Sequence, residues 1–255
     1  MKKITILLFL IALGLNAQSP AQSMYFNRNL KSNLKMAKSD FGQLDRRTLS
    51  GVVWYKRYQT GVHSQNWALG NGSNTNPEIS FRCDFNPSNR LTLMIFRNGL
   101  RDYYGKIESL PIYTDKTGWH RIQWAIDLNN PVASDRIRIY HDGSRITTFN
   151  YAKYPNGLYD LAEFNHPISL GGDSPAGNTG SATSYFPGKM CMAAIFSGRI
   201  PYDSELAWQD GSPKDFGSSP NLKCLIRGDA FPLTDDEILT ANWTNSNVDY
   251  SDDVP

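Results

Sequence analysis

The sequence predicts an all-β protein, an antiparallel β-sandwich of two sheets with one or two short helices. Short apolar or alternating segments recur along the 255 residues, separated by clusters of Asn, Asp, Gly, Pro and Ser. Residues 121–128 place a large apolar side chain at every second position, which is the period of a strand with one buried face. Amphipathic helical periodicity is scarce.

The first strands are expected at residues 24–26 and 49–58, and the second of these is rich in β-branched and aromatic side chains. Residues 79–85 and 91–97 flank the sequence Asn-Pro-Ser-Asn at 86–89. These four residue types favour turns. The two flanking segments should therefore form a hairpin.

The central part of the chain carries the clearest pattern. The residues expected to face the core are Ile122, Trp124, Ile126, Ile137 and Ile139. The dipeptide Asp142-Gly143 then separates the strand at 137–141 from a further apolar run at 146–149. An Asp-Gly pair between two such runs predicts a type I′ turn, because both of its central residues need a positive φ.

Further strands are expected at residues 168–170, 190–196 and 222–227. Residues 204–209 and 235–241 are the two candidates for a short helix. The second candidate opens with a Thr followed three residues later by Glu, which is the pattern of a capping box.

No internal repeat or long linker divides the chain, so residues 22–255 are predicted to form one domain. The longest loops are expected at 70–77 and 171–184, which are rich in Gly, Asn, Ser and Thr. Loops of this kind lie at the rims of sandwiches, where binding sites are common.

The N-terminus has the order of a secretory signal peptide. Lys2 and Lys3 precede a largely apolar run at 4–15, and small and polar residues follow up to Ala21. The run is shorter than the roughly 20 residues that span a bilayer, which disfavours the alternative of an uncleaved membrane anchor. We expect a signal peptide over residues 1–21, cleaved after Ala17 or Ala21, and a secreted or surface-displayed protein without a membrane span.

Charge and cysteine content exclude several classes of protein. Of the 26 Lys and Arg residues, removal of Lys2 and Lys3 with the leader leaves 24, against 24 Asp and Glu. A chain with no net charge has no overall electrostatic field that would attract nucleic acid. The cysteines, Cys83, Cys191 and Cys224, allow at most one disulfide, or act as three buried apolar side chains. No Cys-x-x-Cys or His-x-His spacing points to zinc.

The order of four segments resembles the concanavalin A-like, laminin-G-like jelly-roll superfamily. They are residues 49–56, 119–123 with 138–143, 168–172 with 185–190, and 195–199 with 203–206. Trp119-His120, followed by Tyr140-His141-Asp142-Gly143, is similar to the central Trp-His … Tyr-x-Asp/Asn-Gly hairpin of that superfamily. The likeness covers residues 22–228 and implies two curved sheets. It also implies binding of a glycan or a protein, in some members with calcium.

A lectin-like site usually combines an aromatic face with fixed polar groups. The candidate ligand-binding residues are the aromatics expected in loops: Trp67, Tyr103, Tyr104, Tyr151 and Tyr154. Calcium prefers several oxygen ligands, and Asp173 and Asn178 in the glycine-rich loop are the candidate metal ligands.

The same superfamily includes glycoside hydrolases, which present Glu-x-Asp-x-x-Glu or a variant one residue longer on one strand. None of the glutamates in this sequence has Asp two residues later, so we expect no enzyme. The favoured function is therefore a carbohydrate-binding module. The alternative is a structural or adhesion module that displays loops at a cell or virion surface, and a glycosidase of another design comes third.

Overall fold

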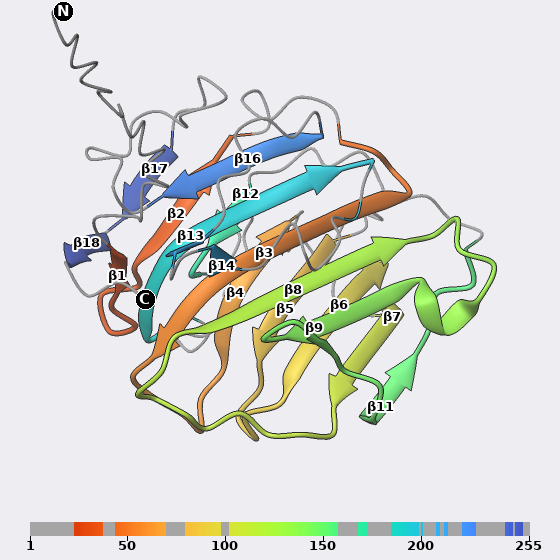
Figure 1. Ribbon diagram of the computed structural model, residues 1–255, viewed down its shortest axis with the longest axis horizontal. Helices are drawn as coiled ribbons and strands as arrows, with labels where there is room; N and C mark the ends of the chain where they lie inside the picture. Colours follow the sequence, from red (N-terminus) through yellow and green to blue (C-terminus); the bar gives the residue numbers. More distant parts are fainter. Residues whose placement is uncertain are drawn as a thin grey trace, which may run out of the picture.

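The computed structural model describes residues 23–37, 44–69, 80–97, 102–157, 168–172, 185–198, 200, 208–209, 212–213, 221–227, 243–246 and 248–251. Within these residues the chain forms two antiparallel sheets that lie face to face (Figure 1). The helical content of the same residues is one 3-10 turn, Ala133–Asp135. The predicted all-β sandwich is confirmed.

We call the sheet nearer the viewer in Figure 1 the front sheet. Its strands are β1 (Ser23–Phe26), β3 (Thr48–Arg57), β8 (His120–Asp127), β9 (Ile137–His141), β10 (Ser144–Arg145), β13 (Gly188–Ser197), β16 (Leu222–Arg227) and β18 (Val248–Ser251). They follow the order β10-β9-β8-β3-β13-β1-β18, and β16 also pairs with β13.

The second sheet, the back sheet, lies behind it. Its strands are β2 (Asn33–Met36), β4 (Ser64–Leu69), β5 (Ser80–Phe85), β6 (Leu91–Arg97), β7 (Asp102–Ser109), β11 (Phe149–Lys153), β12 (Ile168–Leu170) and β17 (Trp243–Ser246), in the order β11-β7-β6-β5-β4-β12-β2-β17. A separate pair is made by β14 (Trp208–Gln209) and β15 (Ser212–Pro213).

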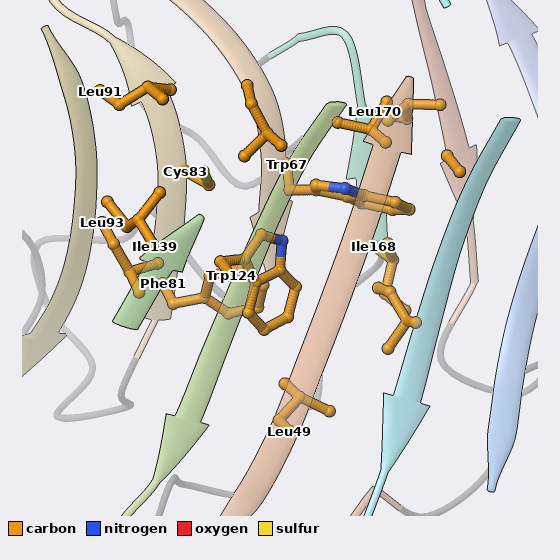
Figure 2. Close-up of a cluster of buried hydrophobic side chains, with 14 of the residues drawn as sticks. Leu49, Trp67, Phe81, Cys83, Leu91, Leu93, Trp124, Ile139, Ile168 and Leu170 are labelled. Atoms are coloured by element: carbon orange, nitrogen blue, oxygen red, sulfur yellow. The ribbon is translucent and has the colours of Figure 1, made fainter. Parts of the chain in front are cut away.

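The alternation in β8 and β9 directs side chains into the core as predicted. The expected residues, Ile122, Trp124, Ile126, Ile137 and Ile139, are all at most 1% exposed and belong to one cluster between the sheets. Trp124 reaches across to the back sheet, where its ring centroid lies 4.4 Å from that of Phe81 (Figure 2). The indole therefore joins the two layers.

The Trp124 ring requires a glycine opposite it. Gly51 of β3 pairs directly with Trp124 of β8. A β carbon at position 51 would lie 2.4 Å from Trp124 Cζ2, closer than van der Waals contact permits. The missing side chain of Gly51 thus makes room for the Trp124 indole.

Both predicted turns are present. Asp142 and Gly143 have φ angles of 47° and 80°, as a type I′ turn requires. Asn89, with a φ of 58°, closes the turn that joins β5 and β6. The strand after Gly143 differs from the prediction, because β10 is two residues long and the chain then crosses to β11 of the back sheet.

The structure contains several strands that the sequence did not indicate, among them β2, β4, β7, β17 and β18. In β4 and β7 a β-bulge interrupts the alternation, so no two-residue period is visible. A helix was expected at 204–209, but residues 208–209 form strand β14, so the prediction is wrong there. Residues 204–207 lie outside the described part of the chain.

The cysteines that can be placed are buried and free. Cys83 lies in the cluster between the sheets, and Cys191 lies in a second cluster with Val52 and Trp54. The interpretation as small apolar side chains is confirmed for these two, while the Cys224 side chain is outside the description.

The predicted leader (1–21) and the helix at 235–241 lie outside the described residues. Within the part that is described, no helix has the length and apolar character needed to cross a membrane.

Replacing Trp124 with alanine should lower the free energy of unfolding by about 3–5 kcal/mol, because a cavity replaces a buried indole. Urea denaturation monitored by far-ultraviolet circular dichroism measures this. A loss below about 1 kcal/mol would contradict the placement of Trp124 in the core.

Gly51→Ala should destabilise the protein by about 1–3 kcal/mol through overpacking against the indole. In a Trp124→Phe background the cost should fall, because the phenyl ring has no atom at the Cζ2 position. A double-mutant cycle measures this coupling. Equal costs in both backgrounds would show that the ring is not what excludes a side chain at position 51.

Candidate functional site

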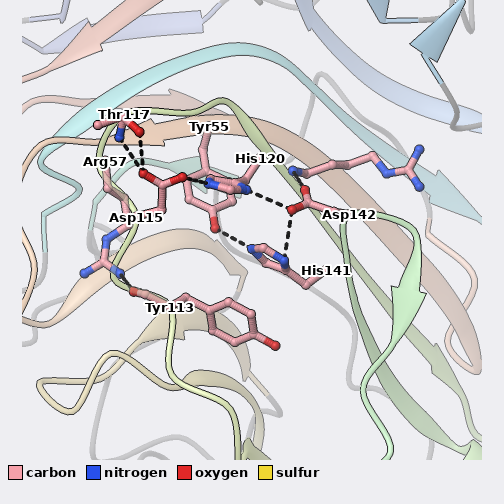
Figure 3. A network of polar contacts seen from close by, with 9 residues as sticks. Tyr55, Arg57, Tyr113, Asp115, Thr117, His120, His141 and Asp142 are labelled. Carbon is pink, nitrogen blue, oxygen red and sulfur yellow. Dashed lines mark hydrogen bonds and ion pairs between the residues drawn. The ribbon is translucent and has the colours of Figure 1, made fainter.

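One end of the sandwich contains a pocket of about 270 Å³, formed where β3 ends and β8 begins. Its lining residues are Tyr55, Arg57, Ile112, Tyr113, Thr114, Asp115, His120 and His141. Figure 3 shows six of them, all except Ile112 and Thr114. They come from two adjacent strands of the front sheet, from the end of β9, and from the segment that precedes β8.

The two histidines occupy the inward-facing positions at the pocket ends of their strands, His120 as the first residue of β8 and His141 as the last residue of β9. His120 follows the alternation of Ile122 and Trp124 in β8, and His141 follows that of Ile139 in β9. Across the ladder, His120 pairs with Tyr55 and His141 pairs with Ile122. The same period that fills the core thus places imidazoles at its open end.

The segment before β8 closes the pocket by attaching to the other layer. The Tyr113 backbone N–H donates to the Asn89 carbonyl at 2.9 Å, in the turn between β5 and β6. The Tyr113 ring stacks on the His141 ring, with centroids 4.2 Å apart and an interplanar angle of 30°. Tyr113 therefore forms an aromatic wall held by both sheets.

Arg57 forms a buried clamp beside this wall. Its guanidinium donates to the Tyr113 carbonyl at 3.1 Å and to Asn89 Oδ1 at 3.2 Å, and it lies 4.1 Å from the Phe85 ring centroid. Burial lowers the pKa of Arg57 to about 10, although nearby Tyr55 acts in the opposite direction. Its Nε has no hydrogen-bond partner among the described residues. It gives this side of the pocket a positive charge.

A chain of polar contacts runs through the site (Figure 3). Asp115 Oδ2 lies 3.1 Å from His120 Nε2, and His120 Nδ1 lies 2.8 Å from Asp142 Oδ2. The same oxygen of Asp142 lies 3.2 Å from His141 Nδ1, and His141 Nε2 lies 2.9 Å from the Tyr55 hydroxyl. Three side chains therefore fix the two imidazole rings: Asp115 from the segment before β8, Asp142 from the turn after β9, and Tyr55 from β3.

The carboxylate at the centre of this chain is itself held in place. Asp142 Oδ1 accepts a hydrogen bond from the Arg121 backbone N–H at 2.7 Å, and the Asp142 N–H donates to the Arg121 carbonyl at 2.9 Å. These bonds tie the turn after β9 to β8. They leave Oδ2 directed at both histidines.

The surroundings shift the pKa values of the two imidazoles in opposite directions. The hydrogen bond to Asp142 raises the pKa of His120 despite partial burial. Burial lowers the pKa of His141 to about 4. Burial would raise the pKa of Asp142, but its bonds to His120 and the Arg121 N–H outweigh this and lower it. Hydrogen bonds from Thr117 lower the pKa of Asp115. At neutral pH the site therefore carries ionised carboxylates and a neutral His141.

Two of the predicted ligand-binding aromatics are in the wrong place for that role. Trp67 was expected in a loop, but it lies in β4 and is fully buried between the sheets (Figure 2). Tyr104, in β7, is 7% exposed, and its hydroxyl donates to Asn156. Tyr154 is partly buried against the core. None of these rings lines the pocket.

Tyr103 and Tyr151 are exposed, as a binding role requires. They are 37% and 43% exposed, on β7 and the neighbouring β11. Lys106 Nζ lies 5.0 Å from the Tyr103 ring centroid and 5.2 Å from that of Tyr151. These three residues form an aromatic platform on the back sheet, separate from the pocket. Their predicted role in binding is untested by this geometry and is the alternative to binding in the pocket.

The predicted calcium ligands, Asp173 and Asn178, lie outside the described residues, so calcium also stays a prediction. The pocket residues His120, His141 and Asp142 were not identified as a site from the sequence. The signal was present: His141 continues an inward-facing stripe, and Trp119-His120 belongs to the motif that carried the resemblance.

Comparison with known proteins supports the fold. No model of a known family and no curated protein matches the sequence. A candidate carbohydrate-binding protein from Bacteroides ovatus is similar, with a TM-score of 0.65 and 10% identity, over 92% of this chain and 60% of that one. The heptameric pentraxin of Limulus polyphemus has a TM-score of 0.57 and 11% identity, over 91% and 95%. Domains LG4-5 of mouse laminin α1 have a TM-score of 0.50 and 15% identity, over 85% and 49%.

The chain therefore has the concanavalin A-like, laminin-G-like jelly-roll fold that the sequence motifs indicated. At these identities the likeness concerns the fold. The chain also spans only 60% of the length of the Bacteroides protein.

Asn89 offers a test of the clamp, because its Oδ1 accepts from both Arg57 and the Gly61 N–H. Asn89→Gly keeps the positive φ but leaves a buried guanidinium N–H unpaired, which should cost about 1–3 kcal/mol in the free energy of unfolding. Asn89→Asp keeps an acceptor and should be close to wild type. Thermal or urea denaturation compares them, and a glycine variant as stable as the aspartate variant would show that the clamp contributes nothing.

Proposed function

We propose that this protein is a non-catalytic carbohydrate-binding module, secreted or displayed at the cell surface, and that the pocket holds the sugar. The observation that carries the proposal is the convergence of an aromatic wall, Tyr113, with fixed polar groups at one open end of a jelly roll. Sites for small polar ligands combine these two elements.

The size of the pocket suits a single sugar unit. Small-molecule sites usually measure about 300–1,000 Å³, and this pocket lies just below that range at about 270 Å³. Ile112, which is 57% exposed, and Tyr113 supply apolar surface for the face of a sugar ring. Asp115 and His120 supply hydrogen-bond partners for hydroxyl groups, and Arg57 favours an electron-rich or acidic substituent.

The carboxylates support binding rather than hydrolysis. Glycoside hydrolysis needs one carboxylic acid whose pKa is raised, so that it can protonate the leaving oxygen. Asp115 and Asp142 instead both have lowered pKa values, because they accept several hydrogen bonds. Neither is suited to act as a general acid at neutral pH.

Two further observations support carbohydrate binding outside the cell. The Bacteroides ovatus protein that shares this fold is itself a candidate carbohydrate-binding protein. The order of residues 1–21 is that of an export signal, which suits a protein that meets glycans outside the cell.

A glycan array with the purified protein tests the proposal, followed by calorimetry with the glycan that binds. Tyr113→Ala and Ile112→Ala should each weaken binding about three- to tenfold, because a ring contact contributes about 0.5–1.5 kcal/mol. Ile112→Ala should leave the melting temperature nearly unchanged, since that side chain is mostly exposed.

Tyr103→Ala and Tyr151→Ala are the matched controls and should bind as wild type does. If these platform variants lose binding while the pocket variants retain it, the sugar lies on the platform and the pocket assignment is wrong. If no glycan binds, the carbohydrate proposal fails and a structural display module becomes the better account.

A further inference from the structure

Three side chains at the end of the β8–β9 pair present metal-binding atoms to one another. The donor atoms of His120, His141 and Asp142 all lie within 4.8 Å of each other. Asp142 Oδ2 faces His120 Nδ1 at 2.8 Å and His141 Nδ1 at 3.2 Å. In a tetrahedral site with metal–ligand bonds of about 2.0–2.2 Å, neighbouring donor atoms lie about 3.3 Å apart. The two distances from Asp142 Oδ2 are thus close to the spacing that a bound ion requires.

We propose that His120, His141 and Asp142 bind one divalent transition-metal ion, with zinc as the best-suited ion. Two imidazole nitrogens and one carboxylate oxygen match zinc, iron, nickel or copper, whereas calcium and magnesium prefer oxygen ligands alone. The inference goes beyond carbohydrate binding and does not depend on it.

The surroundings of both histidines favour this assignment. A metal-binding imidazole usually donates its second N–H to a carboxylate or another oxygen, which orients the ring. His120 Nε2 faces Asp115 Oδ2 at 3.1 Å, and His141 Nε2 faces the Tyr55 hydroxyl at 2.9 Å. In each ring, Nδ1 therefore faces Asp142 Oδ2, and Nε2 faces a side chain that orients the ring.

The site is also rigid and accessible. His120 and His141 lie on adjacent, paired strands, and the bonds of Asp142 to Arg121 hold the carboxylate against β8. The Asp142 side chain is 46% exposed. Three protein ligands with solvent on one side leave a coordination position for water or another ligand, as in open zinc sites.

The test is isothermal titration calorimetry of zinc chloride into the chelator-treated protein, without any added histidine tag. We expect one zinc ion per chain with a dissociation constant in the micromolar range or tighter. His141→Ala and His120→Gln should each weaken binding at least about 100-fold, and Tyr55→Phe should weaken it about 10-fold through loss of an orienting partner. Calcium and magnesium should give no comparable heat.

Two further variants keep the result interpretable. Asp142→Asn suits the positive φ of the turn and keeps an oxygen for the Arg121 N–H, so it should fold and yet bind zinc at least about 10-fold more weakly. His63→Ala removes an imidazole outside the cluster and should bind as wild type does. Absence of zinc binding by the wild type, or wild-type affinity in both His141→Ala and Asp142→Asn, would overturn the proposal. Neither result would affect the glycan array, so failure of the zinc proposal is distinguishable from failure of the carbohydrate proposal.

Discussion

The pairing of β8 with β9 is the constraint on which both the core and the site depend. The register Trp124 opposite Ile139 directs one face of both strands between the sheets. Continued to the strand ends, the same register directs His120 and His141 to the open rim. A slip of one residue would turn every inward side chain outward, so the apolar residues that fix the register also fix the imidazoles. The two bonds between Asp142 and Arg121 lock that end of the pair.

The parts of the fold that could be predicted are those that local chemistry dictates. The alternation around Trp124 and the Asp142-Gly143 turn each depend on neighbouring residues, and both are present. Strands β4 and β7 escaped prediction because a bulge breaks their period, and Trp67 was consequently expected in a loop. A lone aromatic that follows three polar residues does not reveal which face of a bulged strand it occupies.

The site was harder to predict because contacts between the layers and pairing between strands bring its members together. Tyr113 meets Arg57 and Asn89 only when the segment before β8 folds against the β5–β6 turn of the back sheet. Likewise, His120 and Asp142 are 22 residues apart in the sequence and match no His-x-His pattern. Pairing of β8 with β9 places His120 Nδ1 2.8 Å from Asp142 Oδ2. Spacing rules detect ligands on one strand or one loop, but not ligands shared between two strands and a turn.

We propose that the ligand binds at the rim between β3, β8 and the Tyr113 segment. Chemical-shift mapping by nuclear magnetic resonance, with a glycan that binds on the array, tests it most directly. We expect the largest perturbations on the amides around Tyr113, Asp115 and His120 and on the His141 imidazole. Perturbations confined to the strands that carry Tyr103 and Tyr151, with the rim unchanged, would contradict it.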